Sequence, residues 1–100
     1  MSWVKEALSS LEAGQIAKVR PIGGSMRGRI ESGQLVTIAP NTLGDVKIDD
    51  VVFIRWKGNF ILHIVKDIQD GQLLIGNNIG KINGWADPVD VLGVVTSVDD

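Results

Sequence analysis

The chain has 100 residues, with 10 Lys and Arg against 12 Asp and Glu, a net charge of −2 and no cysteine. A chain of this length is expected to form one domain with a hydrophobic core. The sequence has no run of basic residues, so it shows no surface suited to nucleic acid or to an anionic membrane. Without cysteine there are no disulfides, thiolate metal ligands or cysteine nucleophile, as suits a reducing cytoplasm. We therefore expect a cytoplasmic protein that needs no cofactor or metal and binds neither nucleic acid nor membrane.

The first fourteen residues predict a short amphipathic helix. Ser2 is suited to cap its start, apolar residues recur at helical spacing from Trp3 to Leu11, and Gly14 is a natural C-terminal stop. The sequence thus divides into an N-terminal helix, residues 1–14, and a β domain, residues 15–100.

From residue 16 onward the hydrophobic period becomes two, and Val and Ile dominate the apolar positions. Lys57-Gly58-Asn59 and Asp70-Gly71 have the length of hairpin connections, so the central strands should follow one another in antiparallel order. The expected fold class is mostly β, a single domain of antiparallel strands with a short N-terminal helix. The expected strands are residues 16–19, 35–39, 51–56, 60–68, 72–75 and 91–98.

The segment from Gly76 to Trp85 differs from these strands, because it holds three asparagines and three glycines in ten residues. Such a composition is typical of a loop with special backbone angles. The segment is interpreted either as a long surface turn or as a loop that folds over a site and presents amide side chains to it.

Two residues in different segments have the chemistry that acyl transfer needs. Ser25 lies between Gly24 and Met26, a context for a tight turn that exposes its hydroxyl and leaves its N–H free. His63 is the only histidine in the chain, and its ordinary pKa of about 6.5 suits a general base near neutral pH. The plainer alternatives are a simple turn and a hydrogen-bonded core histidine.

Side-chain alternation favours His63 over Lys66 as the base. In a regular strand the odd-numbered residues 61–67 share one face and the even-numbered residues 60–66 share the other. Only a β-bulge would bring Lys66 to the face of His63.

Six short motifs follow one another along the chain: Gly23-Gly24-Ser25-Met26, then residues 34–38, 50–54, 62–65, 76–78 and 91–95. Their order resembles that of the S24/S26 peptidase superfamily, which includes type I signal peptidases and the self-cleaving domains of LexA-like repressors and UmuD-like proteins. The resemblance covers residues 21–98, and the pattern is similar to that of small bacterial members with a Ser/His pair.

By this resemblance Ser25 is the nucleophile that attacks a peptide carbonyl, and His63 is the base in place of the lysine of bacterial signal peptidases. The resemblance also implies oxyanion or orienting positions at Gly23, Met26, Asn77 and Asn78. Asn77 stands where Ser/His members carry an aspartate. An amide can orient an imidazole, but it cannot stabilise the imidazolium as a carboxylate does.

The implied function is a serine-type peptidase with a Ser25/His63 dyad, acting on a peptide or protein substrate within its own chain or in a partner. Two alternatives stay open from the same strands. One is a catalytically silent module that binds an extended peptide as an added strand. The other is an oligomerisation module, such as a homodimer, in which exposed strand edges pair.

Overall fold

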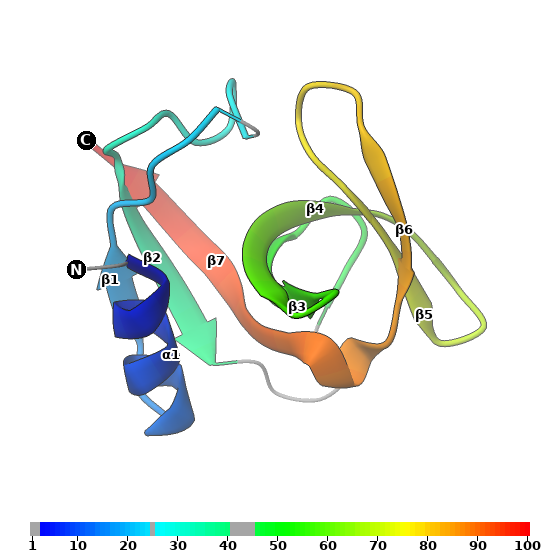
Figure 1. Ribbon diagram of the computed structural model, residues 1–100, viewed down its shortest axis with the longest axis horizontal. Coiled ribbons are helices and arrows are strands. Elements are labelled where there is room, and N and C mark those ends of the chain that lie inside the picture. Colours follow the sequence, from blue (N-terminus) through cyan, green and yellow to red (C-terminus); the bar gives the residue numbers. More distant parts are fainter. Residues whose placement is uncertain (1–2, 25, 41–45) are drawn as a thin grey trace.

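The computed structural model describes residues 3–24, 26–40 and 46–100. Their strands form one antiparallel sheet in the order β1-β2-β7-β3-β4-β5-β6, with the single α-helix beside β1 and β2 (Figure 1). The expected mostly β fold with a short N-terminal helix is confirmed. The elements are α1 (Trp3–Glu12), β1 (Ala17–Val19), β2 (Leu35–Pro40), β3 (Val51–Trp56), β4 (Asn59–Gln69), β5 (Gln72–Gly76), β6 (Ile82–Ala86), the short 3₁₀ helix η1 (Pro88–Asp90) and β7 (Val91–Asp99).

Gly14, the helix stop that the sequence indicated, lies two residues after the end of α1. Gly14 has a φ of 74°, its N–H donates to the Leu11 carbonyl, and the Gln15 N–H donates to the Ser10 carbonyl. This pair of bonds is the Schellman arrangement, which satisfies carbonyls that the helix leaves free. The expected N-terminal cap, Ser2, lies outside the described residues.

The two predicted hairpins are present. In each, the two residues of the turn have positive φ: 49° and 82° at Lys57 and Gly58, and 49° and 76° at Asp70 and Gly71. Positive φ at both central residues matches the type I′ turn, whose twist fits the twist of the flanking strands. Strands β3 to β6 therefore follow one another as antiparallel neighbours.

The prediction of a continuous loop from Gly76 to Trp85 is wrong for its second half. Residues 77–81 form the loop, but β6 begins at Ile82 and pairs with β5. Glycine is tolerated at position 84 of this edge strand because the Trp56 ring occupies the space that a side chain would fill. A Cβ added at position 84 would lie 3.2 Å from the Trp56 ring.

Side chains on β4 alternate as expected only as far as Val65. Phe60, Leu62 and Ile64 pack in the core on the helix side, whereas Ile61 and Val65 pack in a second core. The register then shifts between Val65 and Asp67, so that Ile68 rather than Asp67 continues the face of His63. The predicted facing of Asp67 is wrong because this β-bulge, centred on exposed Lys66, interrupts the alternation.

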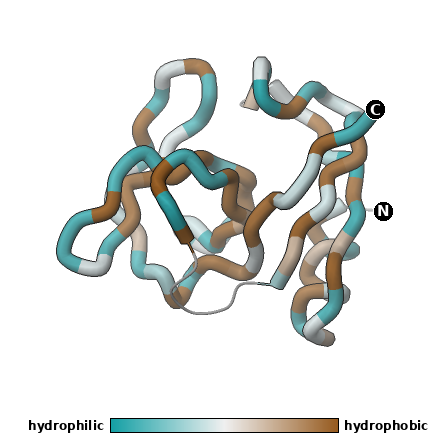
Figure 2. The backbone as a smooth tube through the Cα atoms, turned by 180° about the vertical axis from the view of Figure 1, so that it is seen from behind, coloured by the Kyte–Doolittle hydropathy of each residue, from teal (hydrophilic) through white to brown (hydrophobic). Residues whose placement is uncertain are grey.

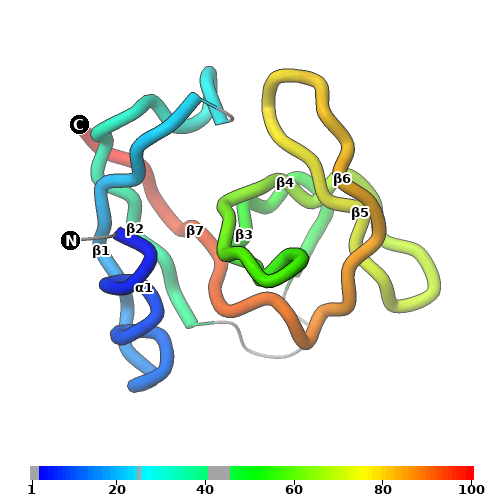
Figure 3. Tube along the Cα trace, viewed as in Figure 1, coloured from blue at the N-terminus to red at the C-terminus, as the bar shows by residue number. Residues whose placement is uncertain are grey.

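The two cores lie on opposite faces of the sheet and meet at β3. The helix-side core contains Ala7, Leu11 and Phe53, and the second core contains Val52 and Ile54. Apolar and polar positions alternate along much of the chain (Figure 2). In the Cα trace, the segment after β1 and the loop between β5 and β6 project from the same side of the molecule (Figure 3).

Gly93 tests how tightly the centre of the sheet is packed. A Cβ at this position of β7 would lie 2.6 Å from Ile38 Cγ2 and 2.7 Å from the Ala39 carbonyl oxygen. We expect Gly93→Ala to lower the free energy of unfolding by about 1–3 kcal/mol, because backbone and side chain must both shift. The matched control is Ser97→Ala on the exposed part of β7, with a change within about 0.5 kcal/mol. Urea unfolding measures both, and equal midpoints for the two variants would contradict the packing argument.

Candidate functional site

His63 lies in the middle of β4 and is only 7 % exposed. Its ring nitrogen Nδ1 contacts the carbonyl oxygen of Leu62. A carbonyl oxygen can only accept, so this contact favours the tautomer in which Nδ1 carries the hydrogen. Nε2 then holds the lone pair that a general base uses.

The surroundings of His63 lower its pKa from 6.5. Burial is the largest cause, and the positive charge of Lys81 acts in the same direction. The Leu62 carbonyl and the side chain of Asn83 oppose them, since both stabilise the protonated ring. The lowered pKa favours the neutral ring, the state in which His63 can accept a proton.

Asn83 is the polar side chain beside His63 that the sequence analysis did not single out. It lies at a register shift of β6, where Gly84 pairs with Ile75 and Ile82 pairs with Gly76. The Oδ1 atom of Asn83 is buried and has no hydrogen bond of normal geometry within the described residues, yet it is near enough to raise the pKa of His63. A β-bulge commonly changes the direction in which a side chain points. In the sequence, Gly84 was the signal that could have predicted a bulge next to Asn83.

Asn77, which the resemblance marked as an orienting residue, uses its side-chain oxygen inside its own loop. Its Oδ1 accepts from the N–H groups of Ile79 and Lys81 at 3.0 and 2.9 Å, and its N–H donates to the Lys81 carbonyl. Asn77 is 6 % exposed. These bonds fix the loop and thereby the position of Lys81 near His63.

Asn78 joins this loop to the segment that contains Ser25. Its Nδ2 donates to the Arg27 carbonyl at 2.7 Å. Gly28 follows directly, with a φ of 95°, and a Cβ there would lie 2.9 Å from Asn78 Nδ2. Position 28 therefore requires glycine for both its backbone conformation and the passage of the asparagine.

Ser25 itself lies outside the described residues, whereas its neighbours on both sides are described. Met26 is 5 % exposed, and its carbonyl accepts from the Ile30 N–H at 2.7 Å. On the other side, the Gly23 N–H donates to Ser32 Oγ at 3.4 Å. The buried methionine thus anchors the chain next to position 25 in the helix-side core.

A second bridge links the segment after Ser25 to β4. The guanidinium of Arg29 donates to Asp49 Oδ1 at 2.9 Å and to the Asp49 carbonyl at 2.7 Å. The Asp49 N–H in turn donates to the Val65 carbonyl at 2.7 Å, two residues beyond His63. Asp49 has a φ of 79°, which is uncommon outside glycine, and these bonds hold it there.

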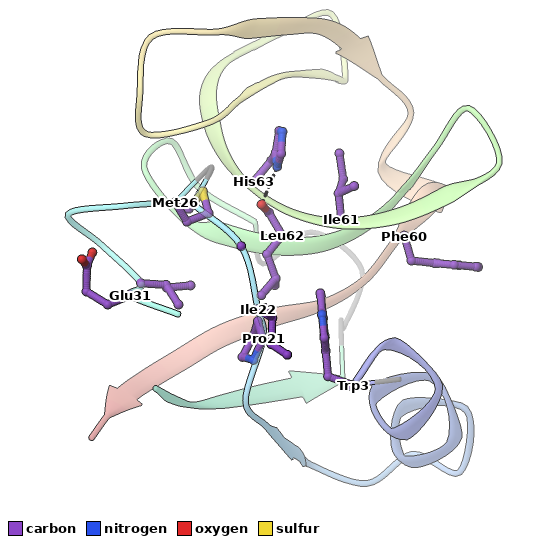
Figure 4. Close-up of a pocket in the computed structure, with 11 residues that line it drawn as sticks. Trp3, Pro21, Ile22, Met26, Glu31, Phe60, Ile61, Leu62 and His63 are labelled. Carbon is purple, nitrogen blue, oxygen red and sulfur yellow. Dashed lines mark hydrogen bonds between the residues drawn. The ribbon is translucent and has the colours of Figure 1, made fainter. Parts of the chain in front are cut away.

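A cleft of about 190 Å³ brings these segments together (Figure 4). One wall comes from residues on both sides of position 25, and the other comes from consecutive residues of β4 that include His63. Helix α1 contributes Trp3. The remaining lining residues are Pro21, Ile22, Gly23, Met26, Ile30, Glu31, Phe60, Ile61 and Leu62.

Comparison with protein-family models, curated proteins and solved structures gave no match. No helix within the described ranges is long and apolar enough to cross a membrane. Within the same ranges, no three His, Cys, Asp or Glu side chains are grouped to hold a metal ion.

The pKa of His63 can be read directly, because a chain with one histidine gives one imidazole signal set. We expect NMR titration to give a pKa below 6.5, and Lys81→Gln to raise it by removing a nearby positive charge. Lys66→Gln is the control and should leave it unchanged. Because the pKa of His63 is lower in the folded than in the unfolded state, the unfolded chain binds a proton more readily, and acid favours unfolding. The free energy of unfolding should therefore fall as the pH drops from about 6.5 through the folded-state pKa, and then level off. A pKa above 6.5 would contradict the burial argument.

Proposed function

We propose that the chain is a serine-type peptidase related to the S24/S26 superfamily, with Ser25 as nucleophile and His63 as general base. One observation carries the proposal: Gly23 and Met26, which lie on either side of position 25, line the same cleft as His63. A nucleophile and its base must come within hydrogen-bond reach of each other, and a shared cleft also gives the substrate access to both.

The surroundings of His63 suit the proton transfers of such a reaction. As the Ser25 oxygen bonds to the substrate carbonyl carbon, His63 Nε2 takes the hydroxyl proton and then delivers it to the leaving amine; water hydrolyses the resulting acyl-enzyme by the same transfers. The Leu62 carbonyl does one part of the work of a triad aspartate, because it fixes the tautomer. It lacks the charge that would stabilise the imidazolium fully.

One edge of β4 has no strand partner near the cleft, and this free edge supports a peptide substrate. The Val65 N–H donates to the Asp50 carbonyl, and the Val65 carbonyl accepts from the Asp49 N–H, so the backbone groups of Val65 point to the edge of β4 that faces β3. Backbone groups of successive residues point to alternate edges of a strand, so those of Phe60 and Leu62 point to the other edge. Strand β3 pairs with Phe60 and Leu62 on one edge of β4. On the other edge β5 pairs with β4 only from Ile64 onward, so no described strand pairs with these two residues there. An extended peptide could add there as a strand, and the cleft, lined by consecutive residues 60–63, runs along this edge.

Covalent labelling tests the proposed nucleophile. We expect a fluorophosphonate probe to label wild-type protein at Ser25, and labelling to rise with pH as His63 loses its proton. Ser25→Ala should abolish labelling, and His63→Ala should slow it by about 10³-fold or more. The matched control, Ser97→Ala, should label like wild type. Peptide binding without labelling would instead favour the silent binding module.

Asn83 offers a way to restore the missing charge. We expect Asn83→Asp to raise the pKa of His63 and to increase the rate of peptide hydrolysis, on the order of tenfold or more, because a carboxylate stabilises the neighbouring imidazolium. Asn77→Asp is the matched control, since the Asn77 oxygen is held by Ile79 and Lys81. Hydrolysis rates across about pH 6 to 9 measure the effect. A larger gain in the control would return the orienting role to Asn77.

A further inference from the structure

Most of the side chains that line the cleft beside His63 are apolar. Trp3, Ile22 and Phe60 come from helix α1, the segment after β1 and strand β4. The Leu62 side chain points toward Ile22, on the opposite side of β4 from His63 (Figure 4). Ile22 is 81 % exposed, the most exposed large apolar side chain among the described residues. An isolated exposed isoleucine needs no explanation, but one at the rim of an apolar cleft enlarges the surface that a ligand could cover.

The volume of the cleft indicates what would fill it. An apolar cavity of about 150 Å³ in another protein is large enough to take up benzene. The cleft of about 190 Å³ therefore has room for the side chain of leucine, methionine or phenylalanine. An alanine methyl group would leave most of it unfilled.

Charge distinguishes one end of the cleft from the other. Glu31 is the only acidic side chain among the lining residues, and no lysine or arginine lines the cleft within the described part of the chain. Figure 4 shows Glu31 and Phe60 at opposite ends of the group. Lys81 acts on His63 and makes that neighbourhood unfavourable for a second cation. A positively charged ligand group is therefore complementary to the Glu31 end.

We propose that this cleft selects an extended peptide segment with one large apolar side chain and a lysine or arginine nearby on the side that faces Glu31. The inference rests on the proposed function in that it names the substrate class of the same site. The apolar side chain enters between Trp3, Ile22 and Phe60, and the basic residue extends toward Glu31. Trp3 makes helix α1 part of the selectivity, since its ring also packs on Phe53 at 5.7 Å between centroids.

Binding to full-length Ser25→Ala protein tests this selectivity without requiring chemistry. The probes are acetylated, amidated hexapeptides of alanine with one leucine and one lysine, the lysine on either side of the leucine. We expect one of the two arrangements to bind, and its affinity to fall on the order of tenfold or more when leucine is replaced by alanine. Replacing lysine by glutamate should weaken binding further, with a salt dependence typical of exposed charges. Calorimetry gives the affinities, and NMR shifts of the Ile22 methyl groups locate the site.

Surface variants with matched controls complete the test. Ile22→Ser should reduce the affinity of the leucine peptide at least fivefold, whereas Val89→Ser, at a residue 76 % exposed and outside this cleft, should not. Glu31→Gln should remove the preference for lysine, and Glu12→Gln should preserve it. Three results would each overturn the inference. They are equal affinity for the leucine and alanine peptides, NMR shifts at residues away from Ile22, and a second copy of the chain covering Ile22 in sedimentation and NMR experiments. Selective binding by a protein that hydrolyses none of these peptides would instead overturn only the peptidase proposal.

Discussion

Strand β3 is buried on both faces, and both cores of the molecule pack against it. Phe53 contacts the helix-side core, whereas Val52 and Ile54 belong to the second core. Because β7 and β4 pair with its two edges, β3 also holds the two halves of the sheet together. The position of β4, and hence of His63, follows from this strand: Val52 pairs directly with His63.

The same packing determines the chemistry available to the histidine. A protonated ring is solvated less well when it is buried than when it is in water, so burial alone makes the ring a weaker base. The Leu62 carbonyl and the bulged Asn83 partly compensate, and Lys81 acts against them. The net effect of these groups is a pKa of His63 below its ordinary value.

Local patterns predicted most of the strands, because alternating Val and Ile and the two Gly-containing turns act over a few residues. The predicted strand 51–56 has the same bounds as β3. The helix stop at Gly14 was predictable because it depends on a single residue with positive φ. The errors at β6 and at Asp67 arise from bulges, which depend on the register between strands and not on either strand alone. For the same reason the sequence indicated an amide near His63 but pointed to Asn77, since only cross-strand pairing shows that the Asn83 side chain lies there.

The bond from Asn78 to the Arg27 carbonyl limits how this chain can vary in length. The loop of residues 77–81 is closed by the side chain of Asn77 and fastened at its tip to the segment after Ser25. An added or deleted residue in either segment would break a contact that neither can re-form by itself. The hairpin turns at residues 57–58 and 70–71 carry no such cross-connection among the described hydrogen bonds. Insertions and deletions should therefore accumulate at those turns, and the two segments joined by Asn78 should change length only together.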